Sequence, residues 1–358
     1  MAEESKQKSN VSIVKCPNCG ADMTYEPSLG ALHCEYCDTS IKPEKTVGGF
    51  SRDFFTEREE GEVEGGASLY RCPNCGGEAE IDNFDSTVEC PFCGATNIVR
   101  TESLRGLKPD TILPFAVSRD DAFACGKKWI KKRLYAPRKL KKNFTAEHFK
   151  GVYTPSFVFG TSTQSYYEAK LGENYTVTIR TSKGVRTEVR TRWFFVSGTF
   201  SKAYRDVVVE ASSALDQQQM NKILPFDLDN KEQYKKEYLA GFAAERYSAS
   251  LDDSFETAKE LIAPDIRQCI LSQYRYDVVG YLNVNTDYDD TRFNYTLLPV
   301  WLCGYKYREK LYRFIVNGRT GRSTGKSPVS VMKVLFTVLV ALGLIGFFVW
   351  LFMYSGLA

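Results

Sequence analysis

The sequence predicts two small tandem zinc ribbons, an α+β domain with a largely antiparallel sheet, and one C-terminal transmembrane helix. Three observations predict this architecture. Eight of the eleven cysteines form four Cys-x-x-Cys pairs, strand and helix patterns fill the middle of the chain, and a long uncharged segment lies near its end. The 358 residues are 43% hydrophobic and 25% charged, which excludes wholesale disorder and allows two or three domains.

The cysteine pairs recur at fixed intervals near the N-terminus. In each half of this region 14 residues separate two pairs, and every cysteine of the first half recurs 56 residues later. Four thiolates brought together from two turns complete a tetrahedral shell that suits Zn²⁺. We therefore predict zinc ribbons at 13–42 and 70–100 that hold two zinc ions, with the ligands Cys16, Cys19, Cys34, Cys37, Cys72, Cys75, Cys90 and Cys93.

Disulfides and an iron–sulfur centre are the alternative uses of these cysteines. A cytosolic location, argued below, disfavours disulfides because the cytosol keeps thiols reduced. In a shell of four protein ligands no water is activated, so we expect no catalysis at the metal. We expect His33 to be a hairpin residue rather than a ligand. The sequence shows no other catalytic constellation, and we predict that the protein is not an enzyme.

The bulk charge does not point to nucleic acid. The formal net charge is +3 with every cysteine counted as neutral. Two Zn(Cys)4 centres, each contributing about −2, would bring it to about −1. A roughly neutral chain lacks the strong positive field of a typical nucleic-acid-binding protein.

The rest of the chain divides by composition. A polar N-terminus at 1–12 has no secretory signal, and an acidic, glycine-containing linker at 43–69, expected to be loosely packed, joins the ribbons. The α+β domain covers 111–326. Strand patterns fill 151–210 and 293–318, and helical patterns fill 118–134, 212–224, 231–248 and 254–274.

Residues 334–354 contain 21 residues without a charge, enough for a helix to cross a bilayer. A buried core helix is the alternative. Four basic residues precede the segment and none follows it, which places the large N-terminal part in the cytoplasm. We therefore predict a single-pass cell-membrane protein with its span at 333–354.

A basic segment at 127–142 has nine lysines or arginines in sixteen residues. It fits either a solvated helix face and loop or a contact with an anionic partner, and nearness to a membrane favours lipid over nucleic acid. The candidate contact residues are Lys127, Lys128, Lys131, Lys132, Arg133, Arg138, Lys139, Lys141 and Lys142.

Two other patterns are not expected to carry chemistry. GRSTGKS at 321–327 is similar to a phosphate loop, but its glycines are one residue too close and the next helix is the span, so we expect no nucleotide. The acidic residues Asp287, Asp289 and Asp290 are expected to lie in an exposed loop.

Longer blocks carry a family resemblance. Paired N-terminal CPxCG ribbons precede GVYTPSFVF, ASSALDQQQMNKILPFDL, YLAGFAAERY and LLPVWLCGYKYREKLYRFIVNGRTG, and an apolar tail follows. Together they resemble a bacterial family of TFIIB-type zinc-ribbon membrane proteins over about residues 16–325. Members are often named primosomal protein N′, a replication-restart helicase, but this sequence shows neither an ATP site nor two motor domains.

The resemblance implies a cellular location and a class of partners, and it implies no particular reaction. It implies neighbours of the SPFH (flotillin-like) and phage-shock protein A classes, and hence a membrane-associated or envelope-stress assembly. The expected function is a membrane-anchored adaptor whose ribbons recruit a cytosolic protein partner. The alternative is a membrane-tethered nucleic-acid-binding protein linked to DNA replication or transcription.

Overall fold

The computed structural model describes residues 14–44, 46, 51–56, 69–72, 78–80, 99–101, 107–137, 140, 145, 146, 149–181, 184–307 and 310–355. Within them, three separate sheets form. The largest has the strand order β11-β10-β14-β15-β16. Four short strands are attached beside this path: β5 (Arg52–Asp53), β9 (Thr111–Ile112), β12 (Glu232–Gln233) and β13 (Ala243–Ala244). The main strands are β10 (Phe149–Thr181), β11 (Gly184–Glu210), β14 (Val278–Tyr307), β15 (Lys310–Asn317) and β16 (Ser323–Gly325).

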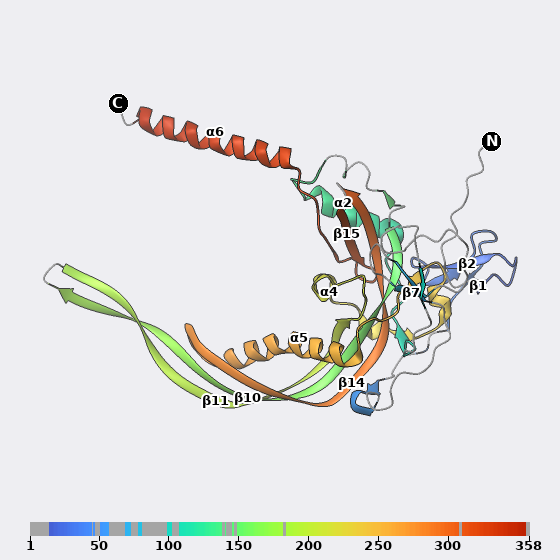
Figure 1. The fold of residues 1–358 in the computed structure, drawn as a ribbon, viewed down its shortest axis with the longest axis horizontal. Helices are drawn as coiled ribbons and strands as arrows, with labels where there is room; N and C mark the ends of the chain where they lie inside the picture. Colours follow the sequence, from blue (N-terminus) through green and yellow to red (C-terminus); the bar gives the residue numbers. More distant parts are fainter. Residues whose placement is uncertain are drawn as a thin grey trace.

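Three antiparallel strands of unusual length dominate this sheet (Figure 1). β10 has 33 residues, β11 has 27 and β14 has 30, whereas most strands have about 3–10. β14 pairs with β10 only as far as Gly172, opposite Val278. Beyond that point β10 and β11 continue as a two-stranded hairpin with a free end.

The long strands bend near Gly160 of β10. Both strands that pair with β10, β11 and β14, have a register shift opposite this residue. The pairing with β11 shifts between Phe159 and Thr161, and the pairing with β14 shifts between Gly160 and Ser162. The extra residues include Asp206 and Asp290, whose φ angles are 57° and 46°. Aspartate tolerates this left-handed conformation better than most residues, and bulges of this kind curve a sheet.

The helix α5 (Leu251–Leu271) lies along the inner, concave side of the bent strands (Figure 1). Ser250 caps its start by accepting a hydrogen bond from the Asp253 N–H. Its buried residues Ile262, Ile266 and Ile270 pack in one cluster with apolar side chains of all three long strands, including Tyr167, Ala169, Leu171, Val196 and Leu282. The helix therefore covers one face of the distal part of the sheet, and no other described helix packs on the opposite face there.

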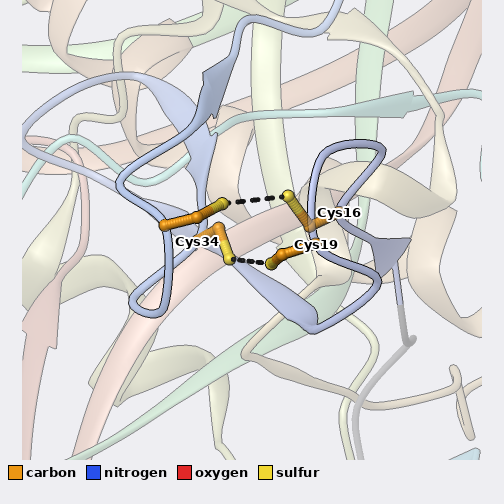
Figure 2. A group of neighbouring side chains, drawn as sticks. Cys16, Cys19 and Cys34 are labelled. Atoms are coloured by element: carbon orange, nitrogen blue, oxygen red, sulfur yellow. Dashed lines mark hydrogen bonds between the residues drawn. The ribbon is translucent and has the colours of Figure 1, made fainter.

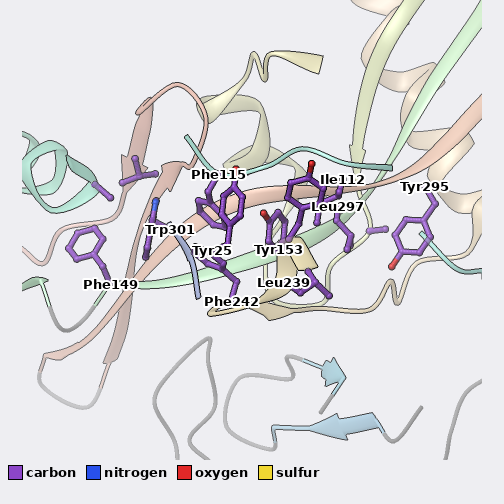
Figure 3. Packing of buried hydrophobic residues seen from close by; sticks show 14 of the residues in the cluster. Tyr25, Ile112, Phe115, Phe149, Tyr153, Leu239, Phe242, Tyr295, Leu297 and Trp301 are labelled. Atoms are coloured by element: carbon purple, nitrogen blue, oxygen red, sulfur yellow. The ribbon is translucent and has the colours of Figure 1, made fainter. Parts of the chain in front are cut away.

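Aromatic rings form the centre of the main core, shown in Figure 3. Phe115 stacks on Phe242 with ring centroids 4.2 Å apart, and contacts Tyr153 and Trp301 at 5.0 Å and 5.1 Å. The Trp301 Nε1–H donates to the Val117 carbonyl at 2.8 Å.

Three helices match the sequence patterns closely. Ser118 caps α2 (Arg119–Lys131), which lies within the predicted 118–134, and Asp120 and Asp121 lie in its first turn. The short helix α4 (Gln217–Ile223) lies within the predicted 212–224, and α5 matches 254–274.

The prediction of a helix over 231–248 is wrong. This segment instead forms β12 (Glu232–Gln233), a short 3-10 turn (Lys236–Leu239) and β13 (Ala243–Ala244), which pairs with β10. Gly241 has a φ of 93°, a conformation that ends a helix. The apolar residues of the segment serve two separate contacts, one with β10 and one with the first ribbon, rather than one helix face.

The first ribbon is a four-stranded antiparallel sheet that packs against this irregular segment. Its strands are β1 (Val14–Lys15), β2 (Asp22–Glu26), β3 (Ala31–His33) and β4 (Ser40–Ile41). The Tyr25 N–H donates to the Ala240 carbonyl at 2.8 Å, and the Tyr25 ring meets Tyr238 edge-on at 5.6 Å. Cys16, Met23, Leu32 and Cys34 belong to the main core cluster.

Part of the segment between the ribbons is also packed onto the body. β5 (Arg52–Asp53) pairs with β14, and the adjacent Phe54 is 2% exposed. Arg52 donates to the Asp110 carboxylate from Nε at 2.9 Å and from Nη2 at 2.7 Å. The expectation of loose packing therefore does not hold for these residues. Farther on, β6 (Leu69–Arg71), β7 (Glu78–Glu80) and β8 (Val99–Thr101) form a small antiparallel sheet.

The C-terminal helix α6 (Val331–Ser355) leaves the body as a separate rod (Figure 1). Residues Val331–Phe352 are long and apolar enough to cross a membrane, and no part of their most apolar stretch is buried inside the protein. The alternative of a buried core helix is therefore wrong.

Two acidic side chains, Glu210 and Glu245, are buried beside the loop that follows β11. The Glu245 carboxylate accepts hydrogen bonds from the Ser213 and Ala214 N–H groups at 3.0 Å and 3.3 Å, and from the Ser212 hydroxyl at 2.5 Å. Burial raises the pKa of Glu245 to about 7. Burial, and then repulsion from Glu245, raise the pKa of Glu210 well above its ordinary value.

We predict that replacing Glu245 with Gln reduces the pH dependence of stability. Since the folded-state pKa of Glu245 is raised, its protonated form stabilises the fold, and this contribution is lost as the pH rises from about 4.5 through about 7. The loss is on the order of 3 kcal/mol. Unfolding of the detergent-solubilised chain between about pH 5 and about pH 8 measures it. The exposed Glu237→Gln is the control, and equal pH slopes for wild type and Glu245→Gln would contradict the prediction.

Candidate metal centre

The first four cysteines converge at one end of the first ribbon. Cys16 and Cys19 come from the turn between β1 and β2, and Cys34 and Cys37 come from the turn between β3 and β4. Their four sulfur atoms all lie within 4.8 Å of one another. The Cys16–Cys37 and Cys19–Cys34 sulfur pairs are each 3.5 Å apart, and Figure 2 shows Cys16, Cys19 and Cys34 pointing toward one another.

The two turns have the same backbone geometry. The Cys16 N–H donates to the Ala21 carbonyl at 2.8 Å and the Gly20 N–H to the Cys16 carbonyl at 2.8 Å. The second turn repeats this pattern, with Cys34 N–H to Thr39 carbonyl at 3.0 Å and Asp38 N–H to Cys34 carbonyl at 2.9 Å. Gly20 and Asp38 occupy equivalent positions, with φ angles of 73° and 61°.

This donor set fits a tetrahedral metal ion. Bonds of about 2.3 Å from a metal to four sulfurs place the sulfurs about 3.8 Å apart, within the range of the observed separations. Cys16, Cys19, Cys34 and Cys37 are free thiols. Cys16, Cys19, Cys34 and Cys37 can therefore hold one metal ion in a closed shell.

Backbone and side-chain donors surround the sulfurs. The Thr39 hydroxyl lies 3.1 Å from the Cys37 sulfur, and this contact together with the Thr39 N–H lowers the pKa of the Cys37 thiol to about 6. Burial opposes ionisation of Cys16, but the Cys19 and Asn18 N–H groups outweigh it and lower the pKa of that thiol. Such donors stabilise thiolates and orient them toward a metal.

His33 is engaged outside this cluster. Its Nδ1 lies 3.1 Å from the Ser40 hydroxyl and its Nε2 lies 3.5 Å from the Asp38 carboxylate. The group of four possible ligands consists of cysteines alone, so His33 is placed as a hairpin residue, as the sequence predicted.

The second predicted ligand set is described only at Cys72, which is 1% exposed at the end of β6. It packs in a core cluster with Leu113, Val152 and Val300. Cys75, Cys90 and Cys93 lie outside the described residues. Among the other cysteines, Cys303 is buried and Cys125 and Cys269 are partly buried.

The basic segment lies at the end of α2, away from the cysteines. Lys127, Lys128, Lys131, Lys132 and Arg133 are all exposed. The Arg133 guanidinium stacks over the Trp129 ring at 4.9 Å, and Lys127 lies over Phe123 at 4.8 Å. The remaining candidates, Arg138, Lys139, Lys141 and Lys142, lie outside the described residues.

The acidic residues expected in a loop lie within the strand β14. Asp290 forms an ion pair with Arg292 at 3.2 Å, at the irregularity that bends the strand. Asp287 and Asp289 line an open pocket of about 510 Å³ beside Phe54, Phe255 and Lys259. The loop expectation failed because these charges fall on the exposed positions of a strand that continues through them.

Comparison with known proteins gives one informative match. The chain is 29% identical over 331 residues to the uncharacterized protein YdjG of Bacillus subtilis (strain 168). The match covers 89% of this chain and 91% of the relative. No protein-family model matches the chain, and no solved structure matches it.

We predict that Cys34→Ser removes one metal ion per chain. The serine hydroxyl replaces a fully buried thiolate and leaves three sulfurs, too few for a closed shell. Elemental analysis of the purified full chain, together with the absorption bands of the cobalt-substituted protein, measures the loss. Cys125→Ser lies outside the cluster and is expected to keep the wild-type metal content. Equal metal content in Cys34→Ser and wild type would contradict the assignment.

Proposed function

We propose that this chain is a non-catalytic, membrane-anchored zinc-ribbon adaptor that recruits a cytosolic protein partner. The observation that carries the proposal is an exposed aromatic surface on the face of β10, β11 and β14 opposite α5. We call this surface the outer face, and it includes Tyr166, Lys170, Trp193, Phe195 and Tyr281. It projects from a body whose described metal-binding group is a closed cysteine shell.

Strand alternation assigns these residues to the outer face. On β11, Phe194 and Val196 pack in the cluster under α5, so the side chains of Trp193 and Phe195 point the other way. Phe195 is 70% exposed and Trp193 is 42% exposed. Tyr281 pairs with Lys170 across the sheet and shares its face.

The sheet holds Trp193 in place. A Cβ atom built at Gly172 or Gly280 would lie 3.1 Å or 3.0 Å from the Trp193 ring, so the indole lies over two positions that have no side chain. The Lys170 ammonium sits 4.9 Å from the Trp193 ring centre and 5.8 Å from that of Phe195. Rigid aromatic rings with an adjacent cation are typical of protein-binding surfaces.

The metal is proposed to be zinc, with a structural role. Four cysteine ligands in a ribbon suit Zn²⁺, and a closed shell leaves no position for water or substrate. The ion would hold together a ribbon whose own core is small and that rests on Tyr238 and Ala240. A second zinc at Cys72, Cys75, Cys90 and Cys93 is part of this proposal, by repetition of the spacing.

The anchor is proposed to be α6 in the cell membrane, with the N-terminal bulk in the cytoplasm. The apolar, unburied surface of α6 supports insertion. Arg319, Arg322, Lys326 and Lys333 precede its apolar part and support the orientation. The SPFH and phage-shock protein A classes, implied by the family resemblance, are the partner classes we propose to test first. A nucleic-acid partner is the less favoured alternative.

We predict that the double variant Trp193→Ser/Phe195→Ser loses the protein partner. Both side chains are exposed and lie outside the buried core clusters, so the substitution removes apolar contact area from the outer face without opening the core. Affinity capture of the full chain from solubilised membranes, with quantification of stoichiometric partners, measures the loss. Tyr175→Ser, on the opposite face of the same hairpin and 42% exposed, is the matched control. Partner recovery that is the same for all three proteins would contradict this surface assignment.

We also predict the topology. A reporter fused to the N-terminus is expected to be active only in the cytoplasm, because the basic residues before α6 remain on that side. Alkaline extraction of membranes is expected to leave the chain in the membrane fraction. An N-terminal reporter active outside the cytoplasm would overturn the orientation.

A further inference from the structure

The first turn of α6 is fastened to the turn that follows α2. The Ser330 N–H donates to the Tyr135 carbonyl at 2.8 Å. The Lys333 ammonium donates to the carbonyls of Leu134 and Ala136 at 3.1 Å and 2.6 Å. These bonds join residues about two hundred positions apart and place the end of α2 beside the start of the apolar helix (Figure 1).

Apolar side chains are exposed on both sides of this junction. Leu134 is 78% exposed, and Val331 and Met332 at the start of α6 are 58% and 76% exposed. Tyr135, whose carbonyl accepts the hydrogen bond from Ser330, is 39% exposed. A single exposed leucine needs no explanation, but the Leu134 carbonyl is bonded to the first turn of a candidate membrane span. If α6 spans a bilayer, Leu134 therefore lies near the level where that helix would enter it.

Positive charge surrounds the same turn. Lys128, Lys131 and Lys132 are exposed, and within the described part of the chain none of them forms an ion pair. The acidic residues of α2, Asp120 and Asp121, lie in its first turn, at the far end of the helix. The lysines at the end of α2 near α6 are therefore not neutralised by an acidic residue in the same turn of that helix.

We propose that this junction is a binding site for the headgroups of anionic phospholipid in the leaflet that α6 enters. Lys128, Lys131 and Lys132 contact lipid phosphates, Leu134 inserts among the upper acyl chains, and Tyr135 lies at the interface. The inference rests on the proposed anchoring of α6. The bilayer is favoured over nucleic acid because the exposed Leu134 continues the apolar surface of α6, which a nucleic-acid backbone would not cover.

A photo-crosslinking experiment on the full chain tests the site. The photoreactive amino acid benzoylphenylalanine replaces the exposed Leu134, and the protein is reconstituted into vesicles of phosphatidylcholine and phosphatidylglycerol, one of them fluorescent. We expect crosslinks to lipid, with phosphatidylglycerol crosslinked severalfold more than its share of the vesicle. In the added triple variant Lys128→Gln/Lys131→Gln/Lys132→Gln we expect crosslinks in the bulk lipid ratio.

The control is a triple variant with the same change of charge at the hairpin, Arg180→Gln/Arg186→Gln/Arg190→Gln, which is expected to keep the preference for phosphatidylglycerol. Three results would overturn the proposal: no lipid crosslink at position 134, a preference unchanged by the lysine substitutions, or displacement of the lipid crosslink by a short duplex DNA at low salt. Flotation of the vesicles separates these from a failure of anchoring, in which the chain would not float with the lipid at all.

Discussion

The constraint on which this structure depends is the covering of three very long antiparallel strands by a single helix. β10, β11 and β14 bury their inner face against α5 through Ile262, Ile266 and Ile270. The bulges opposite Gly160 bend the sheet around that helix. On the opposite face α4 packs near the start of β10, where Met220 and Ile223 cluster with Val152 and Val158, but no described helix covers that face at the distal end of the strands. Trp193 and Phe195 are exposed for this reason, and the two glycines beneath the indole hold it in a defined position without burying it.

The same sheet positions the ribbon. β13 pairs with β10 at Val152 and Tyr153, and the short turn before β13 presents Tyr238 and Ala240 to Tyr25 of the ribbon. The ribbon contributes only a few apolar side chains of its own, so we expect its order to depend both on the metal ion that its four cysteines could hold and on this external contact. Loss of such an ion would therefore disturb the packing of the ribbon against the body of the protein as well as the turns that carry the cysteines.

The sequence predicted what depends on local spacing and missed what depends on distant pairing. The cysteine intervals correctly predicted that four sulfurs come together, and the helical pattern beginning at 118 located the start of α2. The length of β10 could not be read locally, because polar and apolar residues alternate only partly where the hairpin leaves β14 at Gly172. The segment 231–248 has a helix-like pattern, but Gly241 and the competing contacts of Tyr238 and Ala243 decided its structure. The bonds of Lys333 to the turn after α2 have no signal in the sequence, since nearly two hundred residues separate the partners.

The short connection between the sheet and α6 limits how far the α+β domain can lie from the start of α6. Five residues, Lys326 to Ser330, join β16 to α6, and a fully extended chain of that length reaches about 17 Å. The hydrogen bonds of Ser330 and Lys333 shorten this reach further, because they tie the first turn of α6 directly to α2. If α6 spans the bilayer, the domain is therefore held against the membrane surface and not on a long tether. A partner that binds the outer face would then be held close to the membrane, and this is how the proposed adaptor would act.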